Sequence, residues 1–131
     1  MIGLDTNVLV RYILQDDPVQ AAGASKLIEV TLSEQNPGFV SLVAIAETVW
    51  VLDRTYGVPA ETIALVVEGL LQVDRLVFER TQQVFAAVQA LKDGEGEFAD
   101  ALIGAIGRAA GCSHTATFDR RALRMANFEL V

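Results

Sequence analysis

Two aspartates occupy positions from which a carboxylate could take part in catalysis or bind a metal ion. Asp5 directly follows the strand-like run Met1–Leu4, and Asp119 directly follows the strand-like run His114–Phe118. In sheets of parallel strands, ligands bind at the carboxyl ends of the strands, so we expect these two carboxylates to face one crevice. Each aspartate would serve equally well as the N-cap of the helix that is predicted after it.

A third acid, Glu47, lies on a predicted helix among apolar neighbours. The side chains three and four positions away on the same helix face are all apolar: Val43, Trp50 and Val51. We therefore expect the carboxylate to be at least half desolvated, which is costly unless it is paired or bound to a cation. An ion pair with Arg54 is the alternative to a cation site.

The fourth acid, Asp100, lies near the start of another predicted helix. The apolar residues of that helix share one stripe: Phe98, Leu102, Ala105, Ile106 and Ala109. Asp100 lies opposite the stripe, beside Gly96, Gly104 and Gly107, and glycines let a backbone or a ligand approach closely. Its carboxylate could point into a cleft, or it could only complement the helix dipole as a first-turn acid.

Together, the four carboxylates favour a hard divalent cation. Sites rich in oxygen ligands suit Mg²⁺ or Mn²⁺, whereas one cysteine and one histidine, Cys112 and His114, do not make a typical zinc site. Carboxylate-held cations mainly serve phosphoryl transfer, in which the metal activates a water and neutralises charge on the phosphate. Four polar side chains next to the acids could add hydrogen bonds or act only as caps and turn residues: Thr6, Asn7, Ser41 and Thr117.

Other chemistries lack their residues in this sequence. It contains no G-x-S-x-G, no Walker-type G-x-x-x-x-G-K and no G-x-G-x-x-G after a strand. A receiver-like phosphotransfer domain would share the strand-end aspartates but needs a lysine at a late strand end. The only lysines, Lys26 and Lys92, fall in predicted helices, so this class is disfavoured.

Alternating strand and helix patterns would position the candidate residues. Strands are predicted at residues 1–4, 39–41, 76–78, 114–118 and 128–131. Helices are predicted at residues 6–14, 18–33, 42–55, 59–73, 81–92, 97–110 and 119–125. Asp17 is expected to cap the second helix, and Gly111 to follow the end of the sixth. The alternation predicts an α/β fold of parallel β-α-β units with helices on both faces of the sheet.

Length and composition fit a single folded domain over residues 1–131. Of the 131 residues, 52% are hydrophobic, which is enough for a core. The longest stretch without a charged residue, 35–46, is too short to span a membrane, and no signal-peptide pattern is visible. A lone cysteine excludes an internal disulfide and fits a reducing cytoplasm, so we expect a cytoplasmic protein.

The net charge of −7 argues against simple electrostatic binding of nucleic acid, but the charges are unevenly placed. Residues 108–131 hold four arginines against two acids, a net charge of +2, whereas residues 1–107 carry −9. Arg120 and Arg121 directly follow Asp119, and Arg11 lies on the helix after Asp5. These arginines could bind phosphate at the mouth of the site or form ordinary surface ion pairs.

Four sequence blocks resemble the PIN-domain ribonucleases and come in the order that this family has them. They read MIGLDTNVLV at residues 1–10, VSLVAIAET at 40–48, FADALI at 98–103 and TATFDR at 115–120. Each block alone is a weak motif, but the ordered set spans nearly the whole chain. Within the family, the blocks are most similar to the VapC-type toxins of bacterial toxin–antitoxin pairs.

The resemblance implies a three-layer α/β/α fold with a central parallel sheet and Mg²⁺- or Mn²⁺-dependent cleavage of RNA. Carried over to this sequence, the metal-binding and catalytic quartet is Asp5, Glu47, Asp100 and Asp119. Asn7 and Thr117 would be accessory polar residues. The family usually forms homodimers and is silenced by a small antitoxin whose tail fills the active-site groove. The helix pair around residues 57–59 resembles the projecting clip that helps to hold the antitoxin.

Two functions of different classes follow from these residues. In the first, the chain is a metal-dependent endoribonuclease and toxin, in which a metal-activated water attacks an RNA phosphodiester in line. In the second, it is a PIN-like binding module whose acidic cluster is structural, and it should then show no specific Mn²⁺ site.

Overall fold

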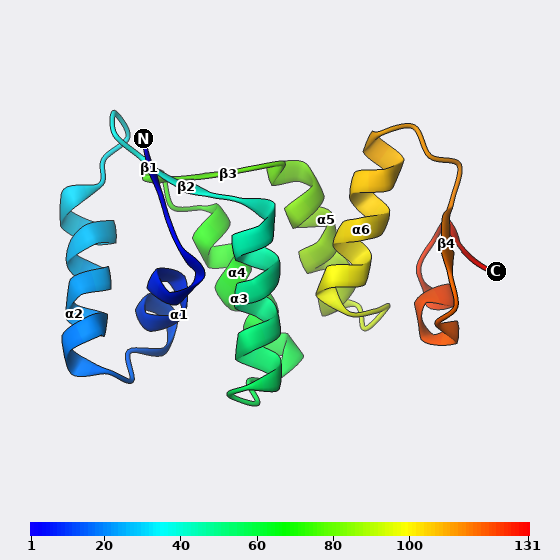
Figure 1. Cartoon of the computed structure of the whole chain (residues 1–131), viewed down its shortest axis with the longest axis horizontal. Coiled ribbons are helices and arrows are strands. Elements are labelled where there is room, and N and C mark those ends of the chain that lie inside the picture. The colour runs from blue at the N-terminus through cyan, green and yellow to red at the C-terminus, as the bar shows by residue number, and fades with distance from the viewer. The chain divides into compact units, whose positions relative to one another are not determined.

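The computed structural model describes all 131 residues, which form two compact units, residues 1–81 and residues 82–131 (Figure 1). The five strands form two sheets, one of three strands and one of two. Every pair of neighbouring strands is parallel, as the alternation of strands and helices predicts. None of the helices has the length and apolar character that a membrane crossing requires.

Unit 1 contains the three-stranded sheet, in the order β1-β2-β3. Its strands are β1 (Ile2–Gly3), β2 (Gly38–Val40) and β3 (Leu76–Phe78). Its helices are α1 (Thr6–Leu14), α2 (Pro18–Lys26), α3 (Leu42–Arg54) and α4 (Ala60–Leu71), and the π-helix η1 (Leu27–Thr31) continues α2. Helix α3 leads away from β2, and α4 returns toward β3 (Figure 1).

The core of unit 1 is built from side chains of all its helices. Fully buried residues come from α1, η1, α3 and α4: Leu9, Ile28, Ile45, Leu52, Ile63 and Val67. Burying each of these side chains contributes about 2 kcal/mol to folding. Thr48 is also fully buried, and its Oγ1 donates a hydrogen bond to the carbonyl oxygen of Ala44 at 2.7 Å, so no polar group is left unsatisfied there. This core fixes the helices that begin at the carboxyl ends of the strands.

Unit 2 contains two helices, a short helix and a pair of strands. In chain order they are α5 (Thr81–Lys92), which starts at the boundary between the units, α6 (Phe98–Ala109), β4 (Thr115–Thr117), the 3-10 helix η2 (Arg120–Arg124) and β5 (Phe128–Leu130). Strand β4 pairs with β5, so a short crossover, residues 118–127, joins two parallel strands.

Capping residues mark the helix ends that the sequence predicts. The side chain of Asp17 accepts hydrogen bonds from the backbone amides of Val19 and Gln20 at 3.1 and 3.0 Å, and Pro18 is the first residue of α2. Gly111 follows the C-cap of α6 with a φ of +97°, a conformation that glycine adopts without strain.

Three local predictions are wrong in detail. The helix predicted at 119–125 is a five-residue 3-10 helix, because the chain must turn back within a few residues to pair β5 with β4. The helix predicted at 18–33 ends in the π-helix η1, which buries Ile28. On α6, Ala101 and Gly104 are buried while Ala109 is exposed, so the buried stripe is rotated from the predicted one.

Candidate functional site

In unit 1, the residues that follow the parallel strands lie at one edge of the sheet. Asp5 follows β1, Ser41 follows β2, and Glu79 follows β3. Asp5 is exposed and caps α1, since its Oδ1 accepts a hydrogen bond from the backbone amide of Thr6 at 2.7 Å. Thr6 is buried and Asn7 is exposed. The structure thus places Asp5 where the sequence predicts it and gives its carboxylate a capping role.

Two side chains of this edge hold the start of α3. Ser41 Oγ accepts a hydrogen bond from the backbone amide of Ala44 at 3.1 Å, so this residue is the helix N-cap. Glu79 Oε1 accepts one from the amide of Leu42 at 2.8 Å. Sequence reasoning passed over Glu79, although an acid directly after the predicted strand at 76–78 is the same signal that identified Asp5.

The expectation that Glu47 is desolvated is wrong. Glu47 is exposed, and its helix neighbours Val43 and Trp50 are 78% and 57% exposed. Helix α3 has apolar residues on two faces, and it buries the face that does not carry Glu47. The Nε atom of Arg54, the partner considered for Glu47, lies 3.2 Å from Asp53 Oδ2. Glu47 is therefore an accessible carboxylate on α3.

Arg11 is engaged within unit 1. Its Nη1 donates to both carboxylate oxygens of Asp16, at 2.7 and 2.8 Å, and its Nη2 donates to the hydroxyl of Tyr56 at 3.2 Å. The pKa of Arg11 is raised, chiefly by the hydrogen bond to Asp16, and the pKa of Asp16 is lowered by the same bond. Of the two roles considered for Arg11, the structure shows the surface ion pair.

In unit 2, Asp100 and Asp119 lie close enough for their charges to affect each other. Asp100 is a half-buried first-turn residue of α6. Burial raises the pKa of its carboxyl, and the negative charges of Glu97 and Asp119 raise it further, while Arg121 opposes them. Glu97 is the N-cap residue of α6, three residues before Asp100, so the spacing that places two side chains on one helix face could have identified it in the sequence.

Asp119 is fixed by its neighbours along the chain. It is the N-cap of η2, with Oδ1 accepting a hydrogen bond from the amide of Arg121 at 2.9 Å. The guanidinium of Arg121 donates to both carboxylate oxygens at 3.2 Å. These bonds lower the pKa of Asp119. The amide of Asp119 in turn donates to Thr117 Oγ1 at 3.0 Å, so Thr117 orients the backbone at the end of β4.

The glycines around α6 accommodate side chains of unit 2 itself. A Cβ on Gly104 would lie 2.6 Å from Cε1 of Phe128, and a Cβ on Gly96 would lie 2.7 Å from the sulfur of Met125. The glycines therefore bring α6 close to the segment that carries Asp119. The prediction that the glycines allow a close approach is confirmed, but the groups that approach are the side chains of Phe128 and Met125 and not a ligand.

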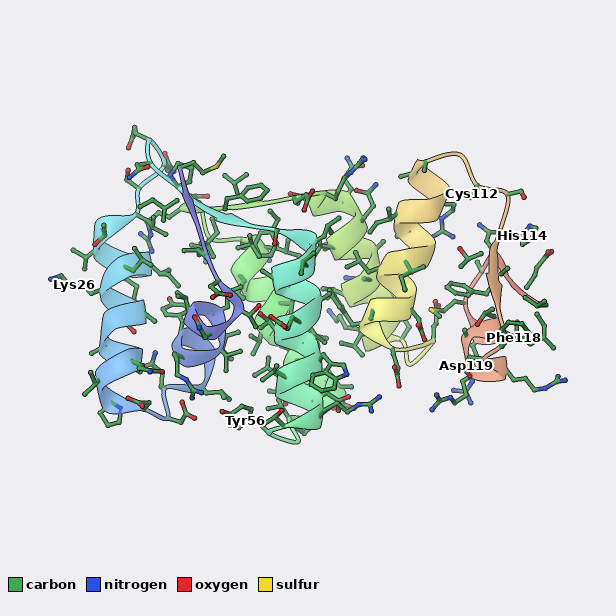
Figure 2. The ribbon with its side chains drawn as sticks, viewed as in Figure 1. Lys26, Tyr56, Cys112, His114, Phe118 and Asp119 are labelled. Atoms are coloured by element: carbon green, nitrogen blue, oxygen red, sulfur yellow. The ribbon has the colours of Figure 1, made fainter.

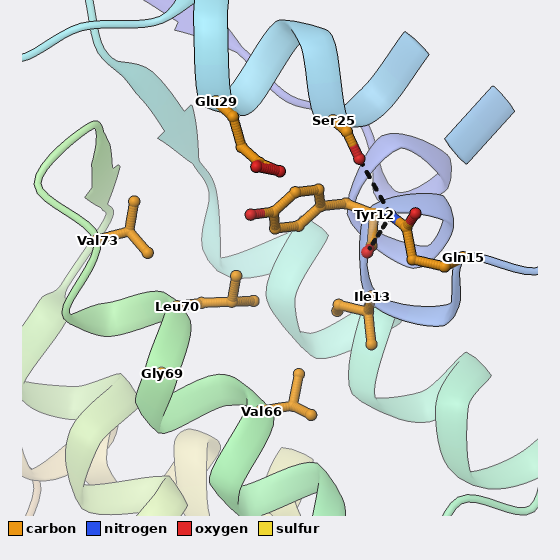
Figure 3. A pocket seen from close by; sticks show the side chains of 9 residues that line it. All are labelled: Tyr12, Ile13, Gln15, Ser25, Glu29, Val66, Gly69, Leu70 and Val73. Carbon is orange, nitrogen blue, oxygen red and sulfur yellow. Dashed lines mark hydrogen bonds between the residues drawn. The ribbon is translucent and has the colours of Figure 1, made fainter. Parts of the chain in front are cut away.

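Unit 1 also has an open hollow of about 470 Å³ between α1, α2, η1 and α4. Its lining is Tyr12, Ile13, Gln15, Ser25, Glu29, Val66, Gly69, Leu70 and Val73 (Figure 3). The Nε2 atom of Gln15 donates to the carbonyl of Tyr12 at 2.9 Å and to Ser25 Oγ at 3.1 Å. None of the predicted site residues lines this hollow, so it is separate from the candidate site.

Each unit contributes two of the four predicted carboxylates: Asp5 and Glu47 in unit 1, and Asp100 and Asp119 in unit 2. Within either unit, no three His, Cys, Asp or Glu side chains come together in a group that could hold a metal ion. The pair in unit 2 is the one that the structure brings together, at the end of β4 and the start of α6.

The sequence matches the PIN domain over residues 2–128. The chain belongs to the PIN-domain family. This match confirms the predicted fold class, a three-layer α/β/α domain with parallel strands. No curated protein matches the chain. PIN domains are generally nucleases that act on nucleic acids and typically use divalent metal ions, so the carboxylates above are the residues to consider for that chemistry.

Proposed function

We propose that this PIN-domain protein is a divalent-metal-dependent endoribonuclease and the toxin component of a toxin–antitoxin pair. The observation that carries the proposal is the carboxylate pair of unit 2 in a chain of a nuclease family. Asp100 is half-buried and its pKa is raised partly by the charge of Asp119, so a bound cation would relieve an existing repulsion. Arg121 donates to both carboxylate oxygens of Asp119, so a bound cation would share or replace this partner.

The residues fit a hard divalent ion because every predicted ligand is a carboxylate. We assign the metal-binding and catalytic roles to Asp5, Glu47, Asp100 and Asp119. When bound, Mg²⁺ or Mn²⁺ would neutralise charge on the scissile phosphate and activate a water for in-line attack. The chain's own part is to hold these groups: the amide of Thr6 binds Asp5, and Thr117 orients the backbone of Asp119. Asn7 and Ser41 would supply further hydrogen bonds.

The substrate that we propose is RNA, with Arg120, Arg121 and Arg11 as the candidates for binding its phosphates. Arg120 is exposed directly after Asp119 and is free to bind phosphate. Arg121 and Arg11 already bind carboxylates, so contact with RNA requires them to share or exchange these partners. We therefore rank Arg120 first among the three arginines.

The toxin role rests on the four sequence blocks that resemble VapC-type toxins. It includes a single PIN domain over residues 1–131, a homodimer, a cytoplasmic location and a cognate antitoxin. The helix pair α3 and α4, joined around Gly57, corresponds to the segment proposed to hold the antitoxin. Co-expression with the neighbouring open reading frame, followed by purification through a tag on either chain, tests this part of the proposal.

The variant Asp5→Asn tests the proposed nuclease activity. Asparagine keeps the oxygen that accepts the hydrogen bond from Thr6 and is as good an N-cap as aspartate, so the fold should persist while Mg²⁺-dependent cleavage of total RNA is lost. Asp17→Asn is the matched control, because Asp17 caps α2 in the same unit with the same chemistry. It should cleave like the wild type. Full cleavage by Asp5→Asn, or cleavage in excess EDTA, contradicts the proposal.

The alternative is a PIN-like binding module without nuclease activity. It is favoured by one observation, namely that Asp5 and Asp119 both already serve as helix caps. Calorimetric titration with Mn²⁺ separates the two functions. A nuclease should bind Mn²⁺ at a specific site that Asp100→Asn weakens at least tenfold, whereas a structural acidic cluster should show no such site.

A further inference from the structure

Phe118 is the most exposed large apolar side chain of the protein, at 83%. It follows the last residue of β4 and directly precedes Asp119, and the two residues lie together at that end of the strand (Figure 2). Single exposed apolar residues are common on protein surfaces, so exposure alone says nothing about a role. The informative feature is the position of this aromatic ring, directly before the predicted catalytic carboxylate of Asp119.

The backbone on both sides of Phe118 is held in place. The carbonyl of Thr117 accepts a hydrogen bond from the amide of Val131 at 2.9 Å, and Thr117 Oγ1 accepts one from the amide of Asp119 at 3.0 Å. The carboxylate of Asp119 is bound by Arg121. The phenyl ring therefore projects from a fixed bend, and little chain entropy would be lost when a flat partner stacks on it.

Three arginines follow Phe118 within six residues: Arg120, Arg121 and Arg124. Arg121 lies among the carboxylates of unit 2 and is paired with Asp119, which leaves Arg120 and Arg124 for a phosphate. Arg120 and Arg124 are exposed, and a guanidinium binds phosphate oxygens well. An exposed aromatic ring with arginines beside it is the combination that binds single-stranded nucleic acid, because each base offers a flat face and each nucleotide a phosphate.

We propose that Phe118 stacks on an unpaired nucleobase of the RNA next to the phosphate that is cut. This inference rests on the proposed function and adds a substrate-positioning residue to it. Bases in an A-form duplex are stacked on one another, and their faces are not available.

The test measures binding of a fluorescein-labelled ten-nucleotide single-stranded RNA in EDTA, by anisotropy. Phe118→Ala should weaken binding about 5- to 100-fold, and Phe118→Trp should retain it. The same RNA with abasic sites should bind wild type and Phe118→Ala equally. Phe85→Ala is the matched control, an exposed phenylalanine of the same unit at 50% exposure, and it should bind like the wild type.

Salt dependence separates the ring from the arginines. Phe118→Ala should leave the slope of log Kd against log salt unchanged, whereas Arg124→Ala should reduce it by about one. Melting temperatures of the two variants equal to that of the wild type would show that substitutions at these exposed positions do not disturb the fold.

Equal affinity of wild type and Phe118→Ala for the base-containing RNA overturns the inference, as does a wild type that binds no RNA. A change of molar mass in light scattering with unchanged RNA affinity assigns Phe118 to a protein contact and overturns it too. The nuclease proposal has its own outcome: wild type that binds through Phe118 but does not cut with Mg²⁺ supports stacking and refutes cleavage. A wild type that cuts RNA, together with a Phe118→Ala variant that binds RNA equally well, supports cleavage and refutes stacking.

Discussion

Gly104 brings α6 close to β5, and one added methyl group tests how tight this packing is. A Cβ at this position would lie 2.6 Å from Cε1 and 3.1 Å from Cζ of Phe128. Carbon atoms in contact prefer about 3.5–4.0 Å, and a phenyl ring is stiff. In Gly104→Ala, the helix and the strand must therefore move apart, or the ring must leave its preferred rotamer.

Two effects of known size oppose each other in this variant. Alanine in place of a helical glycine stabilises by about 1 kcal/mol, whereas overpacking costs about 1–3 kcal/mol. Gly23→Ala is the control, since Gly23 lies within α2 and a Cβ there would meet no atom within 4 Å. Gly23→Ala should therefore show only the stabilisation of about 1 kcal/mol from the helical alanine. The free energies of unfolding of the two variants should differ by about 1–3 kcal/mol, or roughly 3–12 °C in Tm.

Urea unfolding followed by circular dichroism measures both variants against the wild type. Phe128→Leu shortens the opposing side chain, so the double variant with Gly104→Ala should be more stable than the sum of the single effects predicts. Because α6 carries Asp100 and β4 leads to Asp119, cleavage should fall in Gly104→Ala and recover in the double variant. A Gly104→Ala protein as stable as Gly23→Ala refutes the close packing.

Two further predictions concern the folded state of unit 1. Arg11 lowers the pKa of Asp16, and a carboxyl whose pKa is lower in the folded state stabilises the fold above its unfolded pKa and loses that contribution as the pH falls through the folded one. The stability difference between wild type and Asp16→Asn in urea should therefore be present at pH 7 and vanish as the pH falls below about 4; a constant difference across this range contradicts the pair. Ser41→Ala removes the acceptor for the amide of Ala44 and should lower the free energy of unfolding by about 1 kcal/mol, while Ser41→Asp should retain it. An unchanged urea midpoint in Ser41→Ala would mean that Glu79 alone caps α3.

Much of the fold could be predicted because local signals and packing agree. Asp17 and Pro18 begin a helix for reasons that lie within three residues of them, and the structure shows the predicted bonds. The strand at 76–78 and the helix at 6–14 have the predicted bounds. The parallel pairing followed from the alternation of elements.

Features that depend on long-range packing could not be predicted from neighbouring residues in the sequence. Apolar neighbours three and four residues from Glu47 show that these side chains share one helix face, but not whether that face is buried. In the structure, α3 buries its other apolar face against the core. The type of η2 depends on how soon β5 must pair with β4. The four-carboxylate site stays a prediction, of which the structure brings together Asp100 and Asp119.

The crossover of residues 118–127 has a consequence for how the candidate site forms and is lost. It joins β4 to β5 and carries Asp119, Arg121 and the exposed Phe118. Since β5 pairs with β4 and the amide of Val131 binds the carbonyl of Thr117, detaching β5 would release the end of β4 from which the crossover starts, in a single local unfolding event. Such events require less free energy than global unfolding. The proposed nuclease activity would thus be lost through the fraying of three residues while the rest of the domain stays folded.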